Sequence, residues 1–206
     1  MKDTGQRKRI AVFASGNGSN FQAISDYAIK NDINGDIVMV FSDKKDAFVL
    51  KRAEAAGVKT YFLNLQDFKS REEFDREISE ILSKENIDLI CLAGYLLLLS
   101  REFIEKYSGR IINVHPSILP SFKGIHGIKD AFDYGVKITG ATIHFVEFEL
   151  DAGPIIFQKS LEVKEGYSLE KLESEIHKIE HEIYPKAVEL FCKDRIKVVG
   201  RKVKII

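Results

Sequence analysis

The most specific chemistry in the chain lies in the segment Asn113-Val114-His115-Pro116. Asn113 and His115 alternate along a run that we expect to be a strand, so their side chains share one face. Pro116 disfavours a helical conformation at His115 and keeps that residue extended. An amide can stabilise a developing oxyanion and an imidazole can move a proton, so the pair suits acyl transfer. A structural polar pair that closes a strand is the alternative interpretation.

A second candidate pair lies downstream, where His144 ends an apolar run and Asp151 precedes Gly153-Pro154. A carboxylate on a loop tightened by Gly-Pro can orient an imidazole and raise the pKa of that imidazole. The residues alone leave two alternatives open: a core histidine with satisfied hydrogen bonds, and an ordinary turn aspartate.

The segment Ser15-Gly16-Asn17-Gly18-Ser19-Asn20 is a candidate anion site between the first expected strand and helix. Its two glycines let the backbone approach a phosphate, which the N–H groups and dipole of the helix start would face. Ser19 would either cap this helix or donate to the ligand. A dinucleotide fingerprint would need a third glycine in place of Asn20, and Asp43 would then bind a ribose hydroxyl. A nicotinamide oxidoreductase and a glycine-rich turn without a ligand remain alternatives.

The segment from His177 to His181 matches the His-x-x-Glu-His pattern of zinc peptidases. Histidines four residues apart on a helix suit a metal ion. Nothing nearby supplies an obvious third ligand, and the surrounding helix is crowded with charges. We therefore predict a polar helix face and no metal.

The elements that must position these residues follow from the hydrophobic pattern. Strands are expected at residues 9–14, 36–41, 58–63, 87–93 and 110–114, with helices at 19–31, 45–56 and 70–85. After a loop over 115–131 come strands near 138–145 and 154–163, a long helix over 168–192 and a basic hairpin over 195–205. This order predicts a single α/β domain that is Rossmann-like, with a mostly parallel central sheet, helices on both faces and an antiparallel C-terminal part.

The composition excludes several classes of protein. The 206 residues suggest one domain, and 31 basic against 31 acidic residues argue against a general nucleic-acid binder. Two cysteines predict no disulfide framework, and Cys91 is expected to be a buried, inert thiol. The apolar stretch near the start is too short for a signal peptide, and Ile87 to Leu99 is too short for a membrane span. A cytoplasmic location is the expectation.

Taken together, five segments resemble one family: SGNGSNFQAI, LAGYLLLLS, INVHPSILPSFKG, TGATIHFVEFELDAGPII and HEIYP. The chain resembles the formyltransferase family, in particular its phosphoribosylglycinamide formyltransferase branch, from about Arg9 to about Cys192. The resemblance implies transfer of a formyl group from 10-formyltetrahydrofolate to the amine of 5'-phosphoribosylglycinamide in purine (IMP) biosynthesis. The folate would be a consumed cosubstrate, with no tightly bound cofactor. The enzyme would be a monomer or homodimer that binds neither nucleic acid nor membrane.

The resemblance also implies residue roles. His115 would be the proton donor, Asn113 would stabilise the oxyanion, and Asp151 would raise the pKa of His115. The ribonucleotide would contact Gly18, Ser19, Asn20, His177 and Glu180. The folate would contact Arg71, Leu96, Leu97, Leu98, Leu99, Asn113, His144, Glu147, Leu150 and Asp151.

Two further expectations come with the resemblance. Residues 1–110 would bind the ribonucleotide phosphate, and residues 111–206 would carry catalysis and folate binding. The family often has Arg at the position of Leu97, so we expect a different affinity for the folate tail.

Other functions stay open at this stage. Within the superfamily, the chain would formylate another amine or hydrolyse formyltetrahydrofolate. An initiator-tRNA formyltransferase would be expected to add a C-terminal nucleic-acid-binding domain, and a hydrolase an N-terminal regulatory domain; we expect room for neither in this chain. A non-catalytic nucleotide-binding module would lose nothing measurable on replacement of His115 by alanine.

Overall fold

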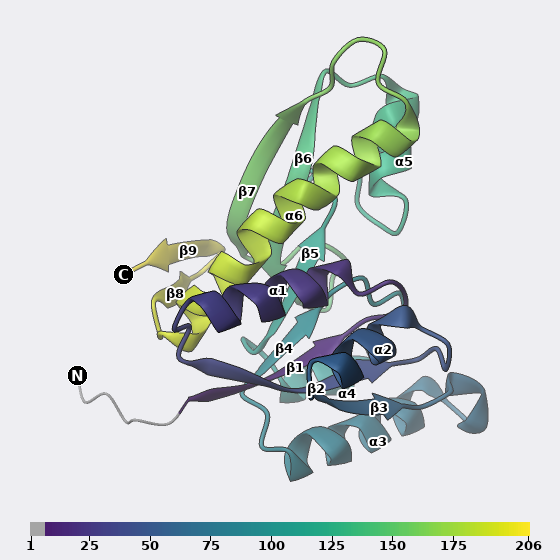
Figure 1. Cartoon of the computed structure of the whole chain (residues 1–206), viewed down its shortest axis with the longest axis vertical. Coiled ribbons are helices and arrows are strands. Elements are labelled where there is room, and N and C mark those ends of the chain that lie inside the picture. The colour runs from purple at the N-terminus through teal and green to yellow at the C-terminus, as the bar shows by residue number, and fades with distance from the viewer. Residues whose placement is uncertain (1–6) are drawn as a thin grey trace.

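The computed structural model describes residues 7–206, whose strands form one sheet (Figure 1). The strands are β1 (Lys8–Phe13), β2 (Gly35–Ser42), β3 (Lys59–Phe62), β4 (Leu89–Leu92), β5 (Ile111–His115), β6 (Ile138–Phe145), β7 (Ile155–Glu162), β8 (Ile196–Val199) and β9 (Lys202–Ile205). The α-helices are α1 (Ser19–Lys30), α2 (Phe48–Ala55), α3 (Arg71–Lys84), α4 (Arg101–Lys106), α5 (Gly127–Tyr134) and α6 (Leu169–Cys192), with a 3-10 turn at η1 (Leu65–Asp67). Residues 1–6, where the signal-peptide prediction begins, lie outside the described part.

The strand order is β3-β2-β1-β4-β5-β6-β7-β9-β8. The pairs among β1 to β5 are all parallel, whereas β6 runs antiparallel to both β5 and β7. The predicted terminal hairpin is formed by β8 and β9, and β9 joins the sheet beside β7. The predicted mostly parallel sheet with an antiparallel C-terminal part is confirmed. The division at residue 110 stays a prediction, and one sheet runs through both halves.

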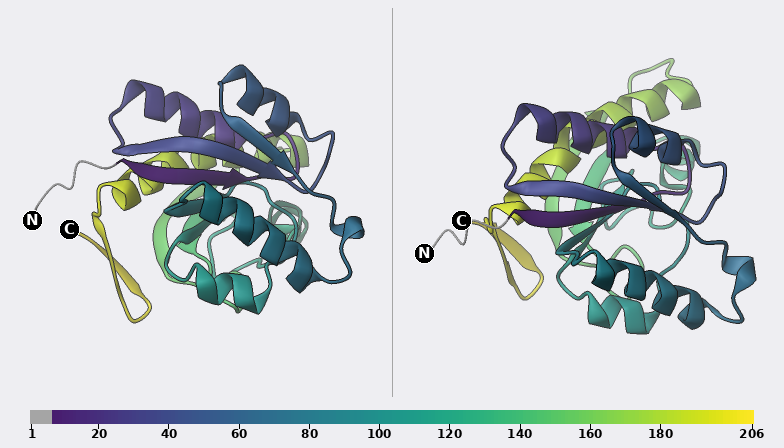
Figure 2. Two further views of the ribbon diagram at one scale, coloured as in Figure 1. Left: turned by 90° about the horizontal axis from the view of Figure 1, so that it is seen from below. Right: turned by 60° about the horizontal axis from the view of Figure 1, so that its bottom comes forward.

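Helices cover both faces of the sheet, as the two turned views show (Figure 2). Alternate residues of β1 explain why both faces need cover, because successive side chains of a strand point to opposite sides. Ile10 and Val12 lie in the core beneath α1, α2 and α6, while Ala11 and Phe13 lie in the core beneath α3 and α4. A strand that is apolar on both faces is typical of a sheet buried between two helical layers.

Three helices differ from the sequence prediction. The segment Arg101–Lys106 is helix α4, which the hydrophobic pattern did not predict because six residues are too few to display a period. Helix α5 begins at Gly127, so the predicted loop over 115–131 is wrong in its last part. Helix α2 begins at Phe48 rather than at residue 45, because residues 44–47 form a turn.

Two other predictions concern buried and apolar segments. Cys91 is fully buried, so the predicted buried thiol is confirmed, and burial raises the pKa of that thiol well above the usual value. No helix within residues 7–206 is long and apolar enough to cross a membrane.

Candidate active site

The three segments with candidate chemistry follow neighbouring strands. Ser15–Asn20 follow β1, Leu96–Leu99 follow β4, and His115 ends β5. These strands are adjacent and parallel, so their carboxyl ends meet at one edge of the sheet. Neighbouring strands lie about 5 Å apart, which puts all three segments within reach of one pair of small substrates. Open α/β sheets bind their ligands at this edge.

Asn113 and His144 are directly opposite each other in the antiparallel pairing of β5 with β6. The Asn113 side-chain nitrogen lies 3.2 Å from His144 Nε2, and His144 Nδ1 lies 2.8 Å from the Phe145 carbonyl oxygen. An amide nitrogen only donates and a carbonyl only accepts, so both contacts fit a neutral ring with its proton on Nδ1. Burial lowers the pKa of His144, which agrees with that form. The pair fixes the direction of the Asn113 amide.

His115 and Asp151 form the second contact of the site. His115 Nδ1 lies 3.4 Å from Asp151 Oδ2, and both side chains are almost fully buried. His115 Nε2 lies 2.8 Å from the Phe122 carbonyl oxygen. Both ring nitrogens thus face oxygen acceptors, and a doubly protonated ring would satisfy both with N–H donors.

The Asp151 turn is held in an unusual backbone conformation. Asp151 has a φ of 49°, a left-handed value uncommon for a residue other than glycine. Its Oδ2 accepts the Gly124 backbone N–H at 2.8 Å, and its Oδ1 lies 3.7 Å from His144 Nε2. A Cβ at Gly153 would lie 1.9 Å from the Phe145 carbonyl oxygen, so only glycine fits the close approach that follows the turn. The carboxylate therefore lies between the two histidines.

Sequence reasoning missed the contacts that hold the loop after His115. Thr142 Oγ1 donates to the Ser117 carbonyl at 2.7 Å and accepts the Leu119 N–H at 3.1 Å. Gln158 Nε2 donates to the Leu119 carbonyl at 2.8 Å. Thr142 stands two residues before His144 on the same strand, so alternation along β6 was an available signal. Gln158 lies on β7 and carried no such signal.

The predicted ribonucleotide residues meet where α1 and α6 approach each other. The Asn20 side chain donates to Glu180 Oε2 at 3.0 Å, and His177 Nδ1 lies 3.0 Å from the same oxygen. Glu180 is 3% exposed, and its hydrogen bond raises the pKa of His177. Gly18 immediately precedes the helix with a φ of 77°, and Ser19 is its first residue. The alternative of Ser19 as a helix cap is therefore wrong, because Gly18 occupies that position.

The predicted folate residues come from two adjacent segments. Leu97 and Leu99 pack into the same apolar cluster as Val146, which starts the segment leading to Glu147 and Leu150. The Arg101 guanidinium stacks on the Phe148 ring at 3.9 Å and joins the two segments. Each segment also contributes exposed apolar side chains, namely Leu96 and Leu98 in the first and Phe148 and Leu150 in the second. Such exposed apolar residues around a polar cluster are typical of a binding site.

Arg71 opens helix α3 beside the folate segment. Its guanidinium nitrogens are buried, and it forms an ion pair with Asp75 at 3.0 Å. It also lies over the Phe74 ring at 5.0 Å. Burial raises the pKa of the neighbouring Tyr95 hydroxyl, and the nearby Arg71 charge opposes that rise. Arg71 therefore lies near Tyr95, the residue before Leu96.

The geometry gives little support to two alternatives from the sequence, a dinucleotide site and a zinc site. Asp43 is 4% exposed and accepts a hydrogen bond from Ser15, so its carboxylate is not presented to a ribose. His177 and His181 stack with ring centroids 6.4 Å apart, and His177 pairs with Glu180. Within residues 7–206, no three His, Cys, Asp or Glu side chains are grouped to hold a metal ion.

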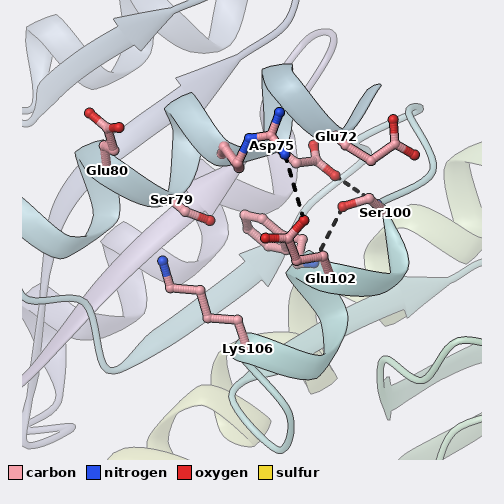
Figure 3. Close-up of a pocket in the computed structure, with 9 residues that line it drawn as sticks. Glu72, Asp75, Ser79, Glu80, Ser100, Glu102 and Lys106 are labelled. Carbon is pink, nitrogen blue, oxygen red and sulfur yellow. Dashed lines mark hydrogen bonds and ion pairs between the residues drawn. The ribbon is translucent and has the colours of Figure 1, made fainter. Parts of the chain in front are cut away.

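A separate groove lies between α3 and α4 (Figure 3). There Asp75 accepts the Ser100 backbone N–H at 2.6 Å, and Ser100 Oγ accepts the Phe103 N–H at 3.3 Å. Arg76 and Glu102 face each other across it at 3.9 Å. Its polar groups start helix α4 and bind it to α3, and none of the predicted site residues lines it.

Comparisons with known proteins show what the whole chain is similar to. A family model described as formyl transferase matches residues 8–188. The phosphoribosylglycinamide formyltransferase of Bacillus subtilis (strain 168) is 41% identical over 182 residues, which cover 88% of this chain and 93% of that protein. The trifunctional purine biosynthetic protein adenosine-3 of Bos taurus is 39% identical over 193 residues, which span 94% of this chain but 19% of that protein. The solved glycinamide ribonucleotide transformylase 1 from Symbiobacterium toebii has a TM-score of 0.95 at 41% identity, covering 98% of this chain and 96% of that one.

Proposed function

Because the chain belongs to the formyl transferase family, we propose that it transfers a formyl group from 10-formyltetrahydrofolate to the amine of 5'-phosphoribosylglycinamide, a step of purine biosynthesis. The observation that carries this proposal is the cluster of Asn113, His115, His144 and Asp151 at the carboxyl edge of the sheet. The Gly18–Asn20 segment follows β1 at the same edge. The names of the relatives support the choice of acceptor.

The proposed reaction is an acyl transfer between two nitrogens. The acceptor amine attacks the formyl carbon, and the carbonyl oxygen becomes the oxyanion of a tetrahedral intermediate. The Asn113 amide, whose direction His144 fixes, donates to that oxyanion. A protonated His115 would turn its Nε2–H from the Phe122 carbonyl to the same oxyanion and keep its Nδ1–H on Asp151. The bond from carbon to folate nitrogen then breaks. His115 gives a proton to the leaving folate nitrogen. The neutral imidazole that remains then accepts a proton from the attacking amine.

Asp151 supports His115 in this scheme. Its carboxylate faces His115 Nδ1, so a positive charge on the ring has an anionic neighbour in a buried setting. The left-handed turn at Asp151 and the N–H of Gly124 hold the carboxylate in place. The scheme needs no redox step, because formyl transfer between nitrogens changes no oxidation state.

The two substrates would approach the catalytic cluster from different sides. The backbone N–H groups at the start of α1 suit the phosphate, with Asn20, His177 and Glu180 beside the ribose. The apolar segments at Leu96–Leu99 and Glu147–Leu150 suit a flat heterocycle. Leu97 is an uncharged residue that packs against the core cluster, so its side chain offers the folate tail no charge.

The experiment that tests the function follows folate absorbance with purified chain, 10-formyltetrahydrofolate and phosphoribosylglycinamide. We expect folate release that depends on this acceptor. Release without any acceptor would favour hydrolysis, and release only with another amine would favour a different transferase. Tight binding of NAD(P)H in a fluorescence titration would contradict the transferase function altogether.

A further inference from the structure

The Ser15 hydroxyl lies between a carboxylate and the backbone of the proposed folate segment. Ser15 Oγ donates to Asp43 Oδ1 at 2.5 Å and accepts the Leu96 backbone N–H at 2.9 Å. A hydroxyl has a single proton, and a carboxylate only accepts. Asp43 therefore directs the hydroxyl so that its lone pair faces the Leu96 N–H.

This contact joins the ends of three strands. Ser15 follows β1, Asp43 follows β2, and Leu96 follows β4. A backbone hydrogen bond from Ser15 N–H to the Gly94 carbonyl, at 3.0 Å, gives the segment a second point of attachment. The segment from Gly94 to Leu96 is thus attached to residue 15 through both main chain and side chain.

Because Ser15 and Asp43 are buried, the loss of their hydrogen bond would be costly in free energy. Ser15 is 8% exposed and Asp43 is 4% exposed. A buried carboxylate is costly unless charges or hydrogen bonds compensate it, and here Ser15 and the Lys44 ammonium, 3.5 Å from Asp43 Oδ2, do so. Hydrogen bonds to a charged group in such a setting are stronger than neutral ones.

We propose that Ser15 and Asp43 are positioning residues that fix the backbone of the folate segment Leu96–Leu99. The inference rests on the proposed function, because it assumes that this segment binds the folate. Ser15 also begins the turn that leads to Gly18, but its hydroxyl points to Asp43 and Leu96. Loss of the hydroxyl should therefore weaken folate binding and leave ribonucleotide binding intact.

The test is equilibrium binding of tetrahydrofolate and of phosphoribosylglycinamide to the whole chain, measured by anaerobic calorimetry. In Ser15→Ala we expect the Kd for tetrahydrofolate to rise about tenfold or more, the size of one charge-assisted hydrogen bond. Asp43→Asn keeps an oxygen acceptor for Ser15, so its Kd for tetrahydrofolate should rise less than that of Asp43→Ala. The ribonucleotide Kd should stay within about twofold in every variant.

Ser79→Ala is the matched control, because Ser79 is a buried serine on α3 that faces the groove of Figure 3. It should leave both Kd values unchanged. Hydrogen exchange gives a readout without any substrate: the Leu96 amide should exchange faster in Asp43→Asn than in the wild type.

Two results would overturn the inference and leave the proposed function standing. One is a Ser15→Ala chain that binds tetrahydrofolate like the wild type. The other is a Ser15→Ala chain whose Kd values for both ligands rise equally. If the wild-type chain itself neither bound tetrahydrofolate nor transferred formyl groups, the proposed function would fail first, and the inference with it.

Discussion

The side-chain amide of Asn113 donates to His144 Nε2, 3.2 Å away across the pairing of β5 with β6. This contact selects the amide face that Asn113 presents to the site, and it requires His144 to be neutral. In the proposed mechanism, His144 would act through Asn113 and position its amide for the oxyanion. The first two predictions follow from it.

Replacing His144 with alanine should lower kcat roughly threefold to tenfold, the effect of losing one neutral hydrogen bond. Initial rates of formyl transfer measure this change. The KM for the ribonucleotide should not change, because the hydrogen bonds of His144 go to Asn113 and Phe145 and not to Asn20 or Glu180. Full activity in the variant would show that the Asn113 amide needs no support.

The burial of His144 also predicts how stability depends on pH. Its pKa in the folded chain is lowered, so below the ordinary value of about 6.5 the unfolded chain binds a proton that the folded chain does not. This contribution to stability is complete above that pH and is lost as the pH falls towards the lowered pKa. Urea unfolding, measured about every half pH unit from pH 8 down to pH 5, gives the free energy of unfolding. This free energy should decline less in His144→Gln than in the wild type. Equal declines would contradict a neutral, buried His144.

His115→Ala should lower kcat at least about a hundredfold, because it removes the proposed proton donor. Asp151→Asn keeps the shape of the side chain but loses the charge beside the ring, so kcat should fall and its pH profile should shift. Asp130→Asn, an exposed change on α5, is the control and should match the wild type. An unchanged pH profile in Asp151→Asn would remove Asp151 from the mechanism.

Gly18 gives a test of the phosphate turn. A Cβ there would lie 2.5 Å from Val49 Cγ2, and the φ of 77° disfavours any other residue. Gly18→Ala should cost more than about 1 kcal/mol of unfolding free energy and should raise the KM for the ribonucleotide. A Cβ at Gly16 would meet nothing within 4 Å, so Gly16→Ala should change stability by less than about 0.5 kcal/mol. Equal effects of the two substitutions would count against a specific role for Gly18.

Much of this arrangement could be predicted from the sequence, because apolar residues recur with different periods in strands and in helices. Apolar runs such as that of β1 predicted the parallel part of the sheet, and alternation put Asn113 and His115 on one face. In the structure His115 does lie beside the Asp151 carboxylate, and Asn113 lies beside His144. The resemblance to a family supplied the roles, which spacing alone left open.

Other contacts had no sequence signature. The Phe122 carbonyl reaches His115 from a left-handed residue of a loop, and backbone groups look the same at every position. Helix α4 has six residues, too few to display a period, and the serine that caps it, Ser100, is held by Asp75 of a different helix. The contact between Ser15 and Asp43 joins residues 28 positions apart whose types are ordinary. Tertiary contacts of this kind emerge only once the chain has folded.

Transfer of labelled carbon tests the central claim most directly. The chain would be incubated with 10-formyltetrahydrofolate carrying a 13C formyl group and with phosphoribosylglycinamide, and the products would be identified by mass spectrometry. We predict a formylated ribonucleotide that carries the label, formed in equal amount to the tetrahydrofolate released and strongly reduced in His115→Ala. Labelled formate with an unmodified ribonucleotide would contradict the account.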